Sequence, residues 1–312
     1  MQNPEIDRIK RDFGWTGAIE PLGAENAFVN RQWACASTTF SDEQSTSLDN
    51  AASTSWWFET RNQLINKYFA STQSTAALWD IGSGPGVVSS YLYAHGTPCI
   101  AVEPSRQGVI ASAARGVLSI ESDLESLQLP ESSVHRVGLF DVLEHVEDRQ
   151  KLLKEIRRVL TSSGELVITV PALNYLWSSA DVSAGHFIRY SRRRLKRELA
   201  VHGFKLKKSH YFFVTLVLPL CLLRAIPFRL GIKQPIDDES LLEQNGGKLG
   251  RLLQIFEVNL SRYFPAGTSL FAVAIKDDLF LAVIFRRPVR EGTALLHPST
   301  WPRRLRPRCC RS

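Results

Sequence analysis

The sequence predicts an α/β fold built on an open, mostly parallel sheet with helices on both faces. Short apolar runs alternate with helical patterns from residue 77 to residue 170. Near-continuous apolar strands of this kind are typical of parallel sheets that are covered on both sides. A glycine-rich turn follows the first run, and acids recur near the ends of the first four. Because ligands bind beyond the carboxyl ends of such strands, this pattern indicates one shared ligand site.

The first run, Leu78–Gly86, reads LWDIGSGPG and contains Asp80 and glycines 82, 84 and 86. We expect a strand at about 77–81 and a tight turn close to a ligand, followed by a helix. A dinucleotide loop has the spacing G-x-G-x-x-G, and its helix N-terminus faces a pyrophosphate. Here the spacing is G-x-G-x-G, an aspartate precedes it and no basic residue is near. The loop therefore favours a cofactor with a positive centre and no phosphate.

Further acids follow Asp80 at steps of 23, 20 and 18 residues, about one βα unit each: Glu103, Asp123 and Asp141. The flanking apolar runs predict strands at 98–103, 117–121, 134–140 and 165–170. Helical patterns predict helices at 56–70, 105–114 and 149–160. The four acids should therefore meet at one edge of the sheet.

Residues 173–191 form a polar, aromatic connection of a length that usually carries function. A helix at 191–202 and strands at about 205–212 and 269–275 are expected next. The insertion between those strands holds two apolar pieces, Tyr211–Leu223 and 249–264.

As a helix the first piece would reach about 20 Å, too short for a bilayer core of about 30 Å. The second piece has apolar residues at helical spacing: Leu249, Leu252, Leu253, Phe256, Leu260 and Phe264. Both pieces are read as core or dimer helices. The alternative is a cap over an apolar substrate or a membrane-surface face, with basic residues flanking the first piece.

Several segments resemble the successive motifs of class I S-adenosylmethionine-dependent methyltransferases: DIGSGPG, AVEPS, SDLESLQLPESSVHRVGLFDVLEHVED and GELVITVP. The most similar branch includes ubiquinone-type and many uncharacterised bacterial small-molecule enzymes. WWFETR (56–61), LWSSADVSAGHFIRYSRRRL (176–195) and GTSLFAVAIK (267–276) resemble a subgroup whose substrates are mostly unassigned. The resemblance covers residues 54–276. It implies a doubly wound, Rossmann-like sheet of seven strands with one antiparallel strand near 269–275, and S-adenosylmethionine as the cofactor.

In that reading, the loop Gly82-Ser83-Gly84-Pro85-Gly86 lets the backbone approach the methionine end of the cofactor, where any Cβ would collide. Asp80 orients this loop and favours the cationic amino group and sulfonium. Glu103 accepts both ribose hydroxyls. The resemblance assigns the adenine amino group to Asp123, which is followed by Leu124. Asp141 is either a cofactor contact or a support for its loop.

Methyl transfer gains most from alignment of the reacting atoms, and a base helps when the acceptor holds its proton. The candidates are His186 and Tyr190 in the long loop and His145 after the fourth strand. His145 is weighed against a packing role, and His186 against a structural hydrogen-bond cluster. No histidine and carboxylate set has metal-ligand spacing along the chain, so no metal is expected.

Composition limits the alternatives. The chain has 312 residues and a formal net charge of +7, but residues 286–312 alone hold eight arginines and one acid. The other 285 residues carry 30 basic and 30 acidic side chains, so a nucleic-acid partner is not expected. The tail is read as a disordered extension or an anion-binding arm. Five cysteines without metal spacing and no signal-like N-terminus predict a cytoplasmic protein. Peripheral membrane association through 211–223 is kept as an alternative.

The predicted organisation is an extension and linker at 1–53, a methyltransferase domain at 54–276 with a helical insertion at 213–264, and a C-terminal extension at 277–312. The predicted function is methyl transfer to a small-molecule or lipid-linked acceptor, preferably at a hydroxyl. Two alternatives remain: a nicotinamide-dependent oxidoreductase, and an inactive module that binds the cofactor. The oligomeric state is left open.

Overall fold

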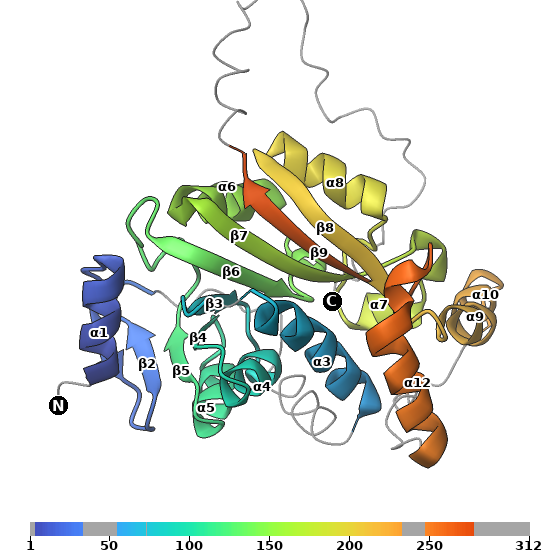
Figure 1. Ribbon diagram of the computed structural model, residues 1–312, viewed down its shortest axis with the longest axis horizontal. Coiled ribbons are helices and arrows are strands. Elements are labelled where there is room, and N and C mark those ends of the chain that lie inside the picture. Colours follow the sequence, from blue (N-terminus) through green and yellow to red (C-terminus); the bar gives the residue numbers. More distant parts are fainter. Residues whose placement is uncertain (1–3, 34–54, 73, 233–246, 278–312) are drawn as a thin grey trace, which may run out of the picture. The chain divides into compact units, whose positions relative to one another are not determined.

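The computed structural model describes residues 4–33, 55–72, 74–232 and 247–277. In this part of the chain, nine strands form one sheet in the order β1-β2-β5-β4-β3-β6-β7-β9-β8 (Figure 1). The strands are β1 (Ile19–Pro21), β2 (Ala27–Asn30), β3 (Leu78–Ile81), β4 (Cys99–Glu103), β5 (Leu118–Glu121), β6 (Val134–Phe140), β7 (Leu160–Pro171), β8 (Phe204–Phe212) and β9 (Ser269–Lys276).

Seven of these strands, from β5 to β8 in spatial order, are the ones that the sequence predicts. β9 runs antiparallel to both of its neighbours, β7 and β8, whereas β5, β4, β3, β6 and β7 are mutually parallel. The predicted α/β fold class, with a mostly parallel sheet and one antiparallel strand among the seven, is confirmed.

The N-terminal region contributes two further strands, which the sequence analysis missed. β2 pairs in parallel with β5, and β1 adds an antiparallel edge. The indole of Trp15 is 2% exposed, donates to the carbonyl oxygen of Leu127 at 2.6 Å and meets Trp79 edge-on at 6.5 Å. Residues 4–33, with α1 at Pro4–Phe13, therefore belong to the sheet and its core rather than to an extension. Most of the predicted linker lies outside the described residues.

Helices cover both faces of the sheet. They are α3 (Trp56–Ala70), α4 (Val87–Ala94), α5 (Arg106–Ala114), α6 (Arg149–Val159), α7 (Ser179–Ser183) and α8 (Arg192–Val201). Alternate strand residues enter two separate cores, because side chains alternate across a strand. Trp79 and Ile100 pack with α6 and α8, whereas Leu78 and Ala101 pack with α3 and α4.

The insertion leaves the sheet at the end of β8 and returns at the start of β9. Phe212 and Pro171 both pair with Ser269, so the insertion begins and ends at the carboxyl edge of the sheet. It contains α9 (Val217–Leu220), a π-helical turn η3 (Cys221–Ala225), α10 (Ile226–Arg229), α12 (Gly247–Leu260) and η4 (Ser261–Tyr263). Tyr211 and Phe212 belong to β8, so the apolar piece 211–223 is not one helix. Among the described helices, none is long and apolar enough to cross a membrane.

α12 is turned opposite to the prediction of a core helix. Two polar residues, Glu257 in α12 and Ser261 at the start of η4, are at most 1% exposed. Glu257 accepts hydrogen bonds from the backbone and hydroxyl of Thr215 at 2.9 and 2.8 Å. Leu252 and Leu260, on its apolar side, are 65% and 47% exposed. The helix is tied to the body partly by polar contacts, such as that between Lys67 and the Asn259 side chain at 2.9 Å.

The chain divides into two units, Met1–Asp278 and Leu279–Ser312. Most of the predicted C-terminal extension, with its arginine-rich tail, falls in the second unit, which lies outside the described residues.

Candidate active site

The turn after β3 lies at the carboxyl edge, against the neighbouring strand β4. The backbone N–H groups of Gly82 and Ser83 donate to the carbonyl oxygen of Val102 at 2.8 and 3.3 Å. Glycines 82, 84 and 86 all have positive φ, at 72°, 54° and 74°. These left-handed conformations explain why the turn uses glycine at each position.

The three glycines differ in what a side chain would meet. A Cβ on Gly84 would find nothing within 4 Å. A Cβ on Gly82 would lie 3.0 Å from Val142, and one on Gly86 would lie 2.2 Å from the Ser112 hydroxyl. The expectation that all three make room for a ligand therefore needs correction. Gly82 and Gly86 allow close packing within the protein, and Gly84 alone borders open space.

Glu103 supports this turn from the end of β4. Its two carboxylate oxygens accept hydrogen bonds from the backbone of Gly84 at 2.8 Å and of Ser105 at 2.9 Å. Burial raises the pKa of Glu103, and these two hydrogen bonds act in the opposite direction. A carboxylate can accept about four hydrogen bonds, so two acceptor positions remain for a ligand. Gly108 is required nearby, because a Cβ there would lie 2.8 Å from Cγ of Glu103.

Asp80 lies in β3, two residues before Gly82 at the start of the turn, and is 1% exposed. Its Oδ2 accepts a hydrogen bond from the Ser89 hydroxyl on α4, and its Oδ1 has no partner within the described structure. Burial raises the pKa of Asp80 to about 7, although Ser89 and Arg61 oppose the shift. An unsatisfied buried carboxylate oxygen calls for an explanation, and a cationic ligand would provide one.

Asp123 and Leu124 follow β5. One oxygen of Asp123 accepts a hydrogen bond from the backbone of Ser126 at 2.7 Å and so closes the turn that begins there. Leu124 is 2% exposed and its side chain belongs to the core. The predicted contribution of Leu124 to adenine binding is therefore left to its backbone atoms, because its side chain packs in the core.

Asp141 has a supporting role that the sequence could not decide. The backbone of Asp141 has a φ of 57°, and its N–H donates to the carbonyl oxygen of Thr169 at 2.9 Å. Its carboxylate contacts Nη1 of Arg61 at 2.5 Å and the Thr169 hydroxyl at 3.2 Å. Because both oxygens have partners in the protein, this geometry favours loop support over direct cofactor binding.

A second polar cluster forms between the turn after β6 and the long loop after β7. Glu144 and His145 lie in η1 (Leu143–His145), and the ring of His145 lies 4.7 Å from that of His186. The backbone N–H of Phe187 donates to the carbonyl oxygen of Glu144 at 2.8 Å and joins the two segments. Burial and the nearby His186 lower the pKa of His145 to about 4, so it is neutral at pH 7.

Glu144 is the most unusual member of this cluster. It is 1% exposed, and neither carboxylate oxygen has a hydrogen-bond partner in the part of the chain that is described. Burial and the nearby Asp141 raise its pKa well above the ordinary value. Glu144, His145 and His186 each offer one atom within 4.8 Å of the others, close enough to hold a metal ion. The spacing of these three residues along the chain did not indicate that they come together. The prediction that no metal is bound was made without this group.

Asp181 fixes His186. Its side chain is fully buried and accepts from Nδ1 of His186 at 2.8 Å and from Nε of Arg189 at 2.7 Å. It also accepts from the backbone of Ser178 at 2.9 Å, at the start of α7. Burial would raise the pKa of Asp181, but His186 and Arg189 together lower it. With Nδ1 of His186 donating to this carboxylate, Nε2 is the nitrogen left to accept a proton.

Tyr190 does not join the cluster. It is fully buried in the core, and burial raises the pKa of its hydroxyl. Its backbone N–H donates to the carbonyl oxygen of Pro171 at 2.8 Å, which anchors the end of the long loop. The prediction of Tyr190 as a catalytic residue is corrected to a structural role.

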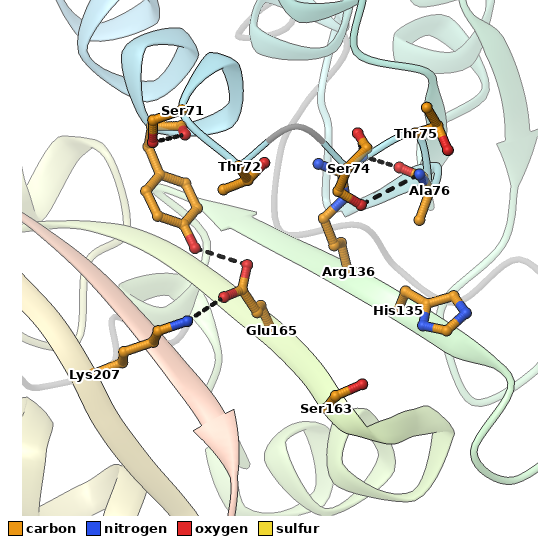
Figure 2. A pocket seen from close by; sticks show the side chains of 11 residues that line it. Ser71, Thr72, Ser74, Thr75, Ala76, His135, Arg136, Ser163, Glu165 and Lys207 are labelled. Carbon is orange, nitrogen blue, oxygen red and sulfur yellow. Dashed lines mark hydrogen bonds and ion pairs between the residues drawn. The ribbon is translucent and has the colours of Figure 1, made fainter.

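A cavity of about 660 Å³ lies elsewhere, at the amino ends of β3, β6 and β7. Glu165 is among the residues that line it (Figure 2). Its carboxylate accepts hydrogen bonds from the Tyr68 hydroxyl at 2.7 Å and from Lys207 at 3.0 Å. Arg136 donates to the carbonyl oxygens of Ser74 and Ala76 on its rim. Since the glycine turn and the acids described above are at the opposite edge of the sheet, this cavity is not the candidate active site.

Comparison with known proteins shows which kind of domain this edge of the sheet resembles. A family model described as "Methyltransferase domain" matches residues 79–168, from β3 to β7. The part of the sheet from β3 to β7 is thus similar to a methyltransferase domain. This match covers the glycine turn, Glu103, Asp123 and the turn with Glu144 and His145. S-adenosylmethionine is the cofactor of this domain.

Two kinds of relative are similar to the chain. A probable S-adenosylmethionine-dependent methyltransferase of Mycobacterium tuberculosis is 29% identical over 118 residues, which are 37% of this chain and 43% of that protein. The match thus spans less than half the length of this relative. A putative methyltransferase of Encephalitozoon cuniculi is 28% identical over 198 residues, 62% of this chain and 82% of the relative.

Solved structures are similar at lower identity. A putative methyltransferase of Haloferax volcanii, in complex with the activator Trm112, is 17% identical with a TM-score of 0.49. The match covers 76% of this chain and 95% of that one. A phosphoethanolamine N-methyltransferase of Haemonchus contortus, in complex with S-adenosylmethionine, is also 17% identical, with a TM-score of 0.49 and coverage of 78% and 59%.

The cofactor assigned to the methyltransferase domain fits the residues on three counts. Gly84 borders open space, Asp80 has an unsatisfied oxygen suited to a cation, and Glu103 retains acceptor positions for hydroxyls. Sequence reasoning missed Arg61, Glu144 and Asp181 as site residues. Arg61 and Glu144 lie inside the quoted motifs WWFETR and LEHVED, and Asp181 lies in the loop quoted for His186.

Proposed function

We propose that this protein transfers the methyl group of S-adenosylmethionine to a hydroxyl of a small-molecule or lipid-linked acceptor. The observation that carries the proposal is the position of two clusters on one sheet edge. The cofactor cluster is at the ends of β3 and β4, and the Glu144–His145–His186 cluster follows β6 and β7. β3 and β6 are neighbours in the sheet, as are β6 and β7.

The cofactor supplies an activated methyl group, so the protein must mainly align it with the acceptor. Asp80 is placed to bind a cation, and Glu103 holds the glycine turn in the shape that leaves Gly84 open. Alignment of reacting atoms can contribute about 7–11 kcal/mol to lowering the barrier. No strongly nucleophilic side chain is required for this step.

A hydroxyl acceptor needs a group that takes its proton. His186 fits this role, because Asp181 accepts from Nδ1 and thereby fixes the ring with Nε2 as the basic nitrogen. His145 is neutral beside it and can hold the acceptor by a hydrogen bond without adding charge. The proton of the acceptor then passes to Nε2 of His186 as the methyl group is transferred.

The test is transfer of radiolabelled methyl from S-adenosylmethionine to lipid and to aqueous extracts. We expect label in a product of one extract. His186→Gln should lower kcat by roughly 10²- to 10³-fold, the scale of general base catalysis, and leave the Kd for the cofactor unchanged. Asp181→Asn should lower kcat in the same direction, since it disturbs the tautomer of His186. His95→Gln, at an exposed histidine, is the matched control.

Other outcomes point to the alternatives. Cofactor binding without label in either extract supports an inactive module. Enhanced NADH fluorescence on binding supports an oxidoreductase. If activity is lost in EDTA and restored by a divalent cation, a metal ion held by Glu144, His145 and His186 would activate the acceptor hydroxyl, and His186 would not be the base.

A further inference from the structure

The segment 217–232, which contains α9, η3 and α10, presents its apolar side chains to solvent. Six of them are between 39% and 70% exposed: Leu218, Leu222, Leu223, Ile226, Leu230 and Ile232. Leu218, Leu222, Ile226 and Leu230 recur every fourth residue and so form one stripe along the helix. A surface helix normally shows the reverse arrangement, with its polar face outward. Contiguous exposed apolar surface of this kind marks an interaction site.

The charges of this segment indicate the kind of surface that it fits. Residues 217–232 contain Arg224 and Arg229 and no acid. In the described residues of the returning piece, 247–264, Arg251 and Arg262 are exposed, and the single acid, Glu257, is buried and bonded to Thr215. Arg229 is the exposed cation of the segment, and Arg251 and Arg262 add exposed positive charge to the same insertion. Exposed apolar side chains with exposed cations, and without exposed acids among these residues, are complementary to an anionic bilayer surface.

The position of the segment connects this apolar surface to the candidate active site. Nη2 of Arg229 donates to the carbonyl oxygen of Tyr175 at 2.9 Å, in the loop η2 (Asn174–Leu176) that follows β7. This loop continues into α7 and the His186 cluster. The segment is therefore attached to the same connection that forms the acceptor side of the candidate active site.

We propose that segment 217–232 docks this protein on anionic membrane surfaces, with the helix lying in the interface plane. A length of 13 residues in α9, η3 and α10 corresponds to about 20 Å, too short to span a bilayer but sufficient to lie in its surface. Docking would hold the acceptor loop beside the lipid headgroups. It needs neither cofactor nor acceptor, so its test is independent of the methyl-transfer proposal.

The test is co-flotation of the 312-residue chain with vesicles of phosphatidylcholine alone or with phosphatidylglycerol added. We expect flotation with the anionic vesicles. A variant with Leu218→Ser, Leu222→Ser, Ile226→Ser and Leu230→Ser should lose at least tenfold in partitioning. Arg229→Gln should reduce partitioning roughly fivefold on anionic vesicles, and not on neutral ones. The arginine-rich tail is present in every variant, so the differences report on the segment.

The matched control is Ile110→Ser with Val201→Ser, two exposed apolar residues on α5 and α8 that should leave flotation unchanged. Circular dichroism and thermal unfolding confirm that each variant is folded. The proposal is overturned if the fourfold variant floats like the wild type. It is also overturned if wild type fails to float and light scattering shows a dimer that the fourfold variant dissociates, since a second copy then covers the stripe. Full protection of the stripe from labelling in the free monomer would instead show that the chain covers it itself.

Discussion

Arg61 on α3 and Asp141 after β6 are 80 positions apart in sequence, yet their side chains meet at 2.5 Å. The guanidinium of Arg61 also lies over the rings of Trp57 and Phe58, at 4.9 and 5.0 Å from their centroids. One arginine thus connects α3, the helix before β3, to the turn after β6. These contacts give Trp57, Phe58 and Arg61 of the motif WWFETR a structural role.

Loss of this contact should destabilise the fold. Arg61 and Asp141 have side chains that are only 7% and 22% exposed, so Arg61→Ala leaves a carboxylate largely buried without its cation. We expect the free energy of unfolding in urea to fall by about 3 kcal/mol. Arg31→Ala, which removes an exposed pair with Glu20, should cost less than about 1 kcal/mol. Equal effects of the two changes would contradict the role given to Arg61.

Glu103→Ala should weaken binding of S-adenosylmethionine by about 1.5–3 kcal/mol, the scale of hydrogen bonds to a charged group. The change removes acceptors for the ligand and also the support of the Gly84 backbone. Isothermal titration calorimetry measures the effect. Glu125→Ala, at an exposed acid after β5, serves as the control and should bind with wild-type affinity. Unchanged affinity in Glu103→Ala would remove the cofactor assignment of this residue.

Gly84→Ala should separate ligand binding from stability. A Cβ at Gly84 would meet no protein atom, so only the cost of a positive φ, about 1–2 kcal/mol, should appear in unfolding. Gly96→Ala carries the same kind of cost at a site remote from the turn, where a Cβ also meets nothing. Both variants should lose similar stability, and Gly84→Ala alone should lose cofactor binding. Normal binding by Gly84→Ala would show that the ligand lies elsewhere.

The affinity for the cofactor should rise with pH through Asp80. Its pKa of about 7 in the folded protein means that it is mostly neutral at pH 6 and mostly ionised at pH 8. A cationic ligand prefers the ionised form, so binding should tighten roughly tenfold between these values. Without ligand the sign is opposite: the raised pKa favours the folded state at low pH, and that contribution is lost as pH rises towards 7 and beyond.

Calorimetry at several pH values, with S-adenosylhomocysteine as a second ligand that lacks the sulfonium, checks this dependence. Asp80→Asn has no carboxylate to ionise, so its affinity should be low and nearly independent of pH between 6 and 8. A wild-type affinity that falls as pH rises would refute the assignment.

The sequence predicted the central fold well, because its strands are strongly patterned. The strand 134–140 and the helix 56–70 were predicted with the bounds that the structure has. β1 and β2 were missed, since strands of three and four residues at a sheet edge carry too little periodicity. Spacing also could not show which side of α12 faces inward: periodicity identifies residues that share a face, but tertiary contacts such as Glu257 with Thr215 decide its direction.

The candidate site also contains residues that the sequence predicted and residues that it did not. Residues that follow successive strands, such as Asp80 and Glu103, were found because a parallel sheet brings strand ends together. Glu144 was not, since its importance depends on being buried beside His186, more than forty residues further along the chain. Tyr190 was misread because a polar aromatic in a functional loop gives no sign of full burial. Pairings across the fold are set by packing, which a single sequence does not display.

The insertion leaves the sheet after Phe212 of β8 and returns at Ser269 of β9, and these two residues pair with each other. Its two ends are therefore fixed neighbours, whatever the length of chain between them. The length of the insertion therefore need not alter the pairing of β8 with β9. We therefore expect that a different insertion, grafted between Phe212 and Ser269, would leave the strands that carry the cofactor cluster in place.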